Sequence, residues 1–126
     1  RKKEMTGLAL LEILERRLDN VVYRLGFAKS RAGARQLTSH GFITVNGKKI
    51  NIPSFEVKVG DEIGINPTKA NSKYIQHLAL ELKEYKPQEW LLLQAKELKG
   101  KVLSKPTPEN TGSTIRMELI IEHYSR

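Results

Sequence analysis

The hydrophobic pattern of the chain changes its period at Gly41, and this change restricts the folds that the chain can adopt. Before Gly41, apolar residues within residues 11–25 recur at spacings of three and four, which is typical of helices. After it, residues 43–45 alternate and lead into Asn46-Gly47, the strongest short-range signal of a type I′ hairpin turn. Helices followed at once by a hairpin predict an α+β domain.

Capping residues predict where the helices begin and end. Thr6 is expected to start the first helix and Gly26 to end it, although Asp19-Asn20 could start a second helix within this segment. One helix and two helices therefore both remain open. Ser30 is expected to start the next helix and Gly41 to end it.

Beyond the hairpin, the pattern predicts shorter elements. A further turn and strand fall within residues 57–65, and a helix capped by Ser72 ends before Pro87. Residues 90–93 form a short buried run, and residues 96–105 are polar and lead into extended coil. Residues 115–121 alternate again and predict a final strand.

The positive charge is concentrated in the first part of the chain. Residues 1–49 hold 11 basic and 4 acidic residues, a surplus of +7 out of a net charge of +8 for the whole chain. No carboxylate lies between Asn20 and Phe55. A local positive field attracts polyanions, so nucleic acid is the first partner to consider. The alternative is a solvated charge run that only keeps the protein soluble.

The candidate contacts lie around the second helical segment and the hairpin. Arg31 and Arg35 are one turn apart on one helix face, beside a helix N-terminus that favours phosphate. Arginines are better candidates than lysines for ordered contacts, because the guanidinium group binds phosphate bidentately. The predicted RNA-binding residues are Arg17, Arg24, Lys29, Ser30, Arg31, Arg35, Gln36, Ser39, His40, Asn46, Lys48, Lys49 and Asn51.

The aromatic residues suggest how RNA would be recognised. Tyr23, Phe27 and Phe42 are expected in the core, so the basic stretch has no spaced platform for stacking bases. Recognition of folded RNA through its shape and phosphates fits this pattern better than sequence-specific binding of a single strand.

Other classes of function lack their sequence signals. The chain has no cysteine, no phosphate-binding glycine loop and no HExxH motif, and His40, His77 and His123 fall on separate predicted elements. We therefore expect no enzyme activity, no cofactor, no metal and no small-molecule substrate. The longest apolar runs, such as residues 90–93, are too short to span a membrane.

Three segments closely resemble a known RNA-binding family. These segments are RLDNVVYRLGF at residues 17–27, SRAGARQLTSHGFITVNGKKINIPSF at residues 30–55, and VKVGDEI at residues 57–63. They resemble the S-four RNA-binding domain. The first of them, together with EHYSR at residues 122–126, is similar to the small-subunit ribosomal protein S-four family in particular.

The resemblance implies a fold and a division of the chain. The family's RNA-binding domain consists of two helices packed on a small bent antiparallel sheet. Residues 17–86 would form this domain, residues 1–16 a helical lead-in, and residues 87–126 an extension that returns toward the lead-in. The third helix and the C-terminal strand would be remnants of a flanking helical domain. Since only 16 residues precede Arg17, an N-terminal region of the family is expected to be missing.

The resemblance also implies a function. Family members bind a multi-helix junction of small-subunit rRNA, nucleate assembly of the subunit body and contribute to translational accuracy beside ribosomal proteins numbers five and twelve. The chain would then act in the small subunit of a cytoplasmic ribosome, or of an organellar one. The alternatives are a stand-alone ribosome-associated protein of the stress or rescue type, the RNA-binding domain of an RNA-modifying enzyme, and a DNA-binding helix-turn-helix protein.

Overall fold

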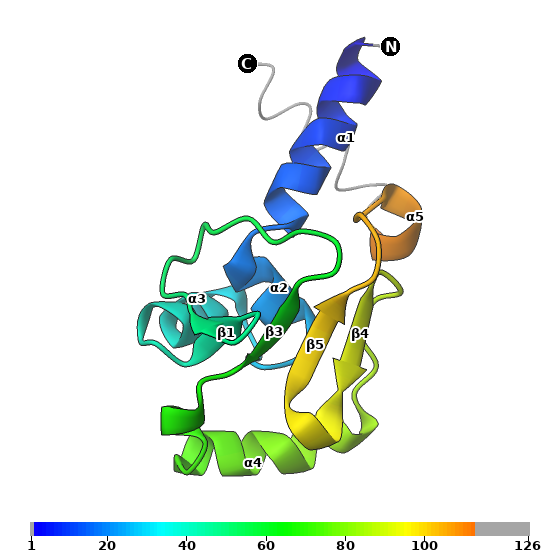
Figure 1. Ribbon diagram of the computed structural model, residues 1–126. Coiled ribbons are helices and arrows are strands. Elements are labelled where there is room, and N and C mark those ends of the chain that lie inside the picture. Colours follow the sequence, from blue (N-terminus) through cyan, green and yellow to red (C-terminus); the bar gives the residue numbers. More distant parts are fainter. Residues whose placement is uncertain (1, 113–126) are drawn as a thin grey trace.

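The computed structural model describes residues 2–112 and has an α+β fold (Figure 1). Its five-stranded antiparallel sheet has the order β2-β1-β3-β5-β4. The strands are β1 Ile43–Val45, β2 Lys48–Lys49, β3 Glu62–Ile65, β4 Leu91–Gln94 and β5 Lys99–Val102. The α-helices are α1 Lys2–Glu15, α2 Leu18–Arg24, α3 Arg31–Ser39, α4 Lys73–Glu81 and α5 Pro108–Thr111. Single 3-10 turns are η1 Pro67–Lys69, η2 Leu82–Glu84 and η3 Ala95–Glu97.

The first helical segment consists of two helices, one of the two possibilities left open by the sequence. The chain breaks at Arg17, which adopts an extended conformation before α2 and makes no side-chain cap. The restart therefore precedes the Asp19-Asn20 pair that was expected to start it. Thr6 lies inside α1, so its predicted role as the first cap is wrong. Lys2, Lys3 and Glu4 have adequate helix propensity, and the helix continues through them.

The caps of α3 agree with the sequence. The Ser30 hydroxyl accepts a hydrogen bond from the Gly33 N–H at 3.0 Å. Gly41 follows the helix with a left-handed φ of +81°, and Gly26 has φ +86° after α2. These two reversals set α2 and α3 against each other and against the sheet.

The hairpin also forms as predicted. Asn46 and Gly47 have φ values of +52° and +82°, as a type I′ turn requires. The turn pairs Thr44 with Lys49 and Val45 with Lys48. β3 then adds to the other edge of β1, and its four residues are the only part of residues 57–65 that joins the sheet.

One strand contradicts the sequence prediction. β5 lies between β3 and β4 in the sheet, within residues 96–105 that were expected to be a polar segment. Only alternate residues of β5 are buried, and one of these is Gly100. A Cβ atom at Gly100 would lie 2.4 Å from Leu25 Cδ1, so the close approach of α2 requires glycine there. A buried glycine gives no apolar signal, which is why the strand was missed.

The core lies between the sheet and helices α2, α3 and α4. Its fully buried members include Leu18, Leu25, Phe27, Ile63 and Trp90. Figure 1 shows α1 projecting away from this body and α4 crossing the opposite end. The strand predicted at residues 115–121 lies outside the described residues. Within residues 2–112, no helix is both long and apolar enough to cross a membrane.

Candidate nucleic-acid interface

The predicted arginines of α2 and α3 lie over three buried polar side chains. Glu15, Asp19 and Asn20 are each no more than 5% exposed. Burying a carboxylate without a charged partner is unfavourable, so the arginines stabilise Glu15 and Asp19. The buried side chains in turn orient the arginines. We call Arg17, Arg24, Arg31 and Arg35 the arginine face.

Arg24 is the most constrained member of the arginine face. Its Nε and Nη2 atoms lie 3.2 and 3.1 Å from the two carboxylate oxygens of Glu15, a bidentate pair. The Arg24 side chain is only 12% exposed. Because its side chain is nearly buried and paired with Glu15 through two nitrogens, Arg24 is less available to RNA than its residue type alone suggested.

Asp19 holds two arginines at once. Arg17 Nε and Nη2 lie 3.1 and 3.2 Å from the two Asp19 oxygens, and Arg35 Nε lies 3.6 Å from Asp19 Oδ2. The hydrogen bond to Asp19 raises the pKa of Arg17, helped by the attraction of the charge and opposed by partial burial. The Arg35 side chain remains 66% exposed, so it can contact a ligand from this position.

Asn20 connects the network to Arg31. Its amide nitrogen donates to the Glu15 carboxylate at 2.8 Å, and its oxygen accepts from Arg31 Nε at 3.2 Å. The Arg31 guanidinium also lies over the Tyr23 ring, 4.8 Å from its centroid. Tyr23 is only partly buried, so the prediction of a core residue fits Phe27 better than Tyr23.

The hairpin presents its cations differently. Lys48 and Lys49 are exposed on β2, and neither has an ion-pair partner among residues 2–112. We call this pair the lysine hairpin. Asn46 is occupied by the turn itself, since its amide donates to Asp61 Oδ1 at 3.0 Å and its oxygen accepts from the Glu62 N–H at 2.9 Å. Its predicted RNA contact would compete with these bonds.

The remaining predicted residues serve several local roles. The Ser30 hydroxyl caps α3, and the Ser39 hydroxyl donates to the Arg35 carbonyl at 2.9 Å. Lys29 Nζ lies 3.5 Å from Glu81 Oε2. Asn51 is exposed in the loop after β2. The fold therefore brings the arginine face together on α2 and α3.

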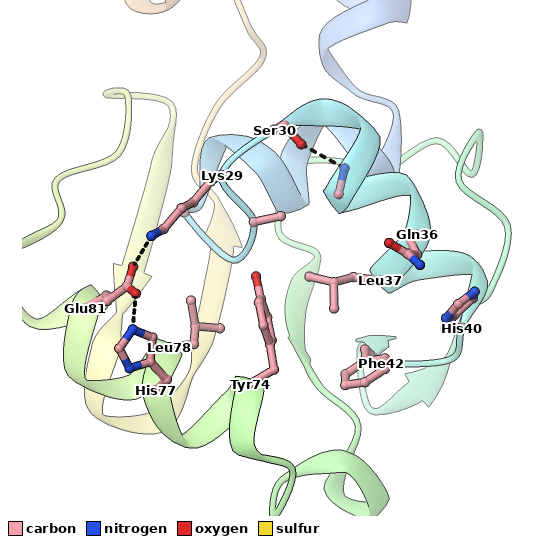
Figure 2. Close-up of a pocket in the computed structure, with 13 residues that line it drawn as sticks. Lys29, Ser30, Gln36, Leu37, His40, Phe42, Tyr74, His77, Leu78 and Glu81 are labelled. Atoms are coloured by element: carbon pink, nitrogen blue, oxygen red, sulfur yellow. Dashed lines mark hydrogen bonds and ion pairs between the residues drawn. The ribbon is translucent and has the colours of Figure 1, made fainter.

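Gln36 and His40 line a groove between α3 and α4, together with Lys29 and Ser30 (Figure 2). The groove has a volume of about 530 Å³. Sequence reasoning missed its other wall, which α4 supplies. The only signal there was the spacing of three and four between residues 74, 77 and 81, which places them on one helix face. Across residues 2–112, no cluster of three His, Asp or Glu side chains could hold a metal ion.

The chain matches the S4 domain, the S-four domain named above, over residues 16–63. This range contains α2, α3 and the hairpin. It also contains every one of the predicted RNA-binding residues, which run from Arg17 to Asn51.

Curated bacterial proteins are similar to the whole chain. The small ribosomal subunit protein uS4 of Fusobacterium nucleatum subsp. nucleatum is 49% identical over 126 residues, which are 100% of this chain and 63% of the relative. The uS4 of Chloroflexus aurantiacus is 49% identical over 128 residues, covering 100% and 62%. The uS4 of Desulforamulus reducens is 47% identical over 126 residues, covering 100% and 61%. The chain thus spans little more than six tenths of these relatives, is similar to uS4 proteins along its whole length and contains a match to the S4 domain.

Proposed function

We propose that the chain is a structural component of the small ribosomal subunit and binds its rRNA directly. One observation supports this proposal most strongly: the residues that match the S4 domain, 16–63, include both the arginine face and the lysine hairpin. The relatives matched along the whole chain are named small ribosomal subunit proteins. This favours a ribosomal protein over the stand-alone RNA binder, the RNA-modifying enzyme and the DNA-binding protein.

In the proposed contact, basic side chains position the RNA and neutralise its phosphate charges, and no reaction takes place. Arg35 is held at one nitrogen by Asp19 and its side chain is 66% exposed, which leaves its other guanidinium N–H groups for phosphate oxygens. Arg31 is oriented on the same helix by its bond to Asn20 and by the Tyr23 ring. Lys48 and Lys49 add attraction that depends on salt. Arranged on rigid helices, the arginines would fit a folded RNA whose phosphates have a fixed spacing.

The finer roles belong to the same proposal. The RNA target is a multi-helix junction of small-subunit rRNA, and binding there nucleates assembly of the subunit body and supports translational accuracy. Its protein neighbours are small-subunit proteins numbers five and twelve, in a cytoplasmic or an organellar ribosome. The chain acts without catalysis, cofactor or metal.

We also propose that the chain divides at residues 16 and 86, as the family resemblance implies. One contact supports the idea that residues 87–126 return toward the lead-in. Lys105 Nζ lies 3.9 Å from Glu12 Oε1 of α1. Within the segment itself, Gln88 donates to the Thr111 carbonyl at 2.9 Å, which holds the start of the segment against α5. β4 and β5 nevertheless share the sheet with β1 and β3, so the segments on either side of residue 86 share one core.

A binding titration tests the proposal. The rRNA domain that holds the junction is titrated at two salt concentrations, with duplex RNA and duplex DNA of equal length as competitors. We expect tight binding that survives both competitors. If about six phosphates are neutralised, log Kd should change with log salt with a slope of roughly 4 to 5 in magnitude. Weak binding that either competitor abolishes, or a slope near 1, would contradict the proposal.

A further inference from the structure

The groove between α3 and α4 has the size and lining of a small-ligand site. Its volume of about 530 Å³ falls within the range of roughly 300–1,000 Å³ that is common for such sites. We call it the α3–α4 groove. Ala28, Leu37 and Leu78 form its apolar interior, and the rings of Phe42 and Tyr74 contribute aromatic surface (Figure 2).

Tyr74 stands in the middle of the groove and is fixed there. Its side-chain hydroxyl donates a hydrogen bond of 2.6 Å to the Phe27 carbonyl, across 47 residues of sequence. The residue nevertheless remains 45% exposed. Burial raises the pKa of Tyr74, and the nearby Glu81 charge adds to the effect, so the hydroxyl stays protonated as a donor at neutral pH. An exposed ring that is held in one orientation is a ready surface for stacking a planar group.

The two ends of the groove carry different polar groups. At one end, the Glu81 carboxylate lies 2.6 Å from His77 Nε2 and 3.5 Å from Lys29 Nζ, so these groups satisfy one another (Figure 2). At the other end lie Gln36 of α3 and His40, the residue that follows α3. Gln36 is exposed, and no side-chain hydrogen bond engages its amide in the described part of the chain. A primary amide offers a donor and an acceptor side by side, which matches the edge of a nucleobase.

The mouth of the groove adjoins the proposed RNA surface. Lys29, Ser30, Gln36 and His40 line the groove and also belong to the predicted RNA-binding residues. An RNA held against α3 would therefore bring its strand past this opening. RNA-binding proteins commonly take up unpaired bases by stacking them on aromatic rings and pairing their edges with polar side chains.

We propose that the α3–α4 groove binds one unpaired nucleobase of the bound RNA, stacked on Tyr74 with its edge toward Gln36. This inference rests on the proposed function for the identity of the RNA. It adds base recognition to a surface that otherwise contacts phosphates. The stacked base would go beyond the recognition by shape and phosphates that the aromatics of the basic stretch favoured, and it would leave the absence of a platform within that stretch unchanged. Tyr74 lies outside that stretch in sequence.

The first test uses a ligand without any ribosomal RNA. Adenosine 5′-monophosphate and ribose 5-phosphate are titrated into the isotope-labelled chain and followed by NMR. We expect the mononucleotide to shift the signals of Leu37, Tyr74 and Leu78, and ribose 5-phosphate, which lacks the base, to leave them unchanged. Equal shifts with both compounds, or shifts with neither, would overturn the inference, because the site would then recognise phosphate or nothing.

The second test compares two tyrosines in the rRNA titration. Tyr74→Ala removes the proposed platform, and Tyr85→Ala is a matched control. Tyr85 is 43% exposed, and its hydroxyl also donates to a backbone carbonyl, that of Arg24 at 2.9 Å. Because a base stacked on an aromatic ring adds to affinity, Tyr74→Ala should weaken rRNA binding about tenfold more than Tyr85→Ala. The salt slope should not change, because a stacked base carries no charge.

Two further variants distinguish a loss of base binding from a loss of folding. Gln36→Ala changes an exposed side chain and should weaken rRNA binding about threefold at unchanged melting temperature. Tyr74→Phe keeps the ring and should retain most of the affinity.

The two tests together separate the possible failures. If the wild-type chain binds rRNA and both tyrosine variants bind it equally, the base site is refuted while the proposed function stands. If the mononucleotide binds but Tyr74→Ala leaves rRNA affinity unchanged, the groove accepts free nucleotides and the RNA-base inference is overturned. If the wild-type chain does not bind rRNA, the proposed function fails, and this inference fails with it.

Discussion

The arginine face and the lysine hairpin are two basic surfaces of similar net charge that are built in opposite ways. Four arginines over the carboxylates of Glu15 and Asp19 leave a formal charge of +2, and Lys48 with Lys49 also gives +2. The arginines are fixed by buried partners, whereas the lysines have none among residues 2–112. Charge alone would not distinguish the two surfaces.

The two surfaces differ in how much side-chain freedom they still lose when they bind RNA. A flexible cation loses side-chain freedom when it grips a phosphate, at a cost of about 0.5–1.5 kcal/mol for each side chain. Arg31 and Arg35 have lost part of that freedom already on folding, through Asn20 and Asp19. The arginine face should therefore supply most of the affinity and fit for folded RNA. The lysine hairpin should supply long-range attraction, which is sensitive to salt.

The largest expected effect comes from removing two cations from each surface in turn. Arg31→Ala with Arg35→Ala should weaken rRNA binding by about 3 kcal/mol, roughly a hundredfold, because each loses a charge-assisted bond. Lys48→Ala with Lys49→Ala removes the same charge and should cost only about 1 kcal/mol. Equilibrium binding at fixed salt measures both losses, and thermal melting checks that both variants fold. Equal losses would erase the distinction between the surfaces.

A smaller effect with an unusual sign is expected for Asp19→Asn. Neutralising a carboxylate beside an RNA surface should tighten binding if only charge mattered. We expect binding to weaken about fivefold instead, since Arg17 and Arg35 both lose the anion that orients them. Glu56→Gln is the control, because it removes one carboxylate that pairs with Arg16 rather than with a member of the arginine face and leaves the backbone bridge between Glu56 and Arg17 in place. Tighter binding of Asp19→Asn would show that Asp19 does not position the arginines.

The partners of the arginines explain why the site was only partly predictable. Sequence placed the arginines on the correct helices, because caps at Ser30 and Gly41 are local signals. The sequence could not show that Glu15 pairs with Arg24, nine residues later in the chain. It also could not show that Asp19 pairs with Arg35 on another helix. Both ion pairs depend on how α1, α2 and α3 pack. A charge count over neighbouring residues therefore overstated the free positive charge on α2 and α3.

The fold could be predicted from the sequence over α2, α3 and the hairpin. The prediction failed where a buried position carries no apolar side chain. The Asn46-Gly47 turn was identified from two residues because few other pairs tolerate its positive φ values. β5 was missed because its inward positions include Gly100, whose role is to admit Leu25. The start of α1 was misplaced because a cap residue such as Thr6 also fits inside a helix when the residues before it favour helix.

Salt dependence should separate the two surfaces further. Lys48→Ala with Lys49→Ala should lower the magnitude of the salt slope by about 2, because each lysine accounts for one neutralised phosphate. Asp19→Asn should leave the slope within about 0.5 of the wild-type value, since the number of phosphate contacts stays the same. Titrations at four or more salt concentrations give the slopes. A slope that the lysine changes leave unaltered would place the hairpin outside the interface.

The smallest effects are expected on the turn that carries the lysine hairpin, and they concern stability rather than affinity. Gly47→Ala should lower the free energy of unfolding by about 1 kcal/mol, because φ +82° is strained for alanine although no atom lies within 4 Å of the added Cβ. Asn46→Ala should cost about 1–2 kcal/mol, since it also loses the bonds to Asp61 and Glu62. Urea denaturation measures both, with Lys48→Ala as a neighbouring control that should change little. Both turn variants should keep rRNA affinity within about twofold of the wild type, because the lysines depend on charge rather than on a fixed orientation. A loss as large as that of Asp19→Asn would mean that the hairpin, like the arginine face, works through geometry.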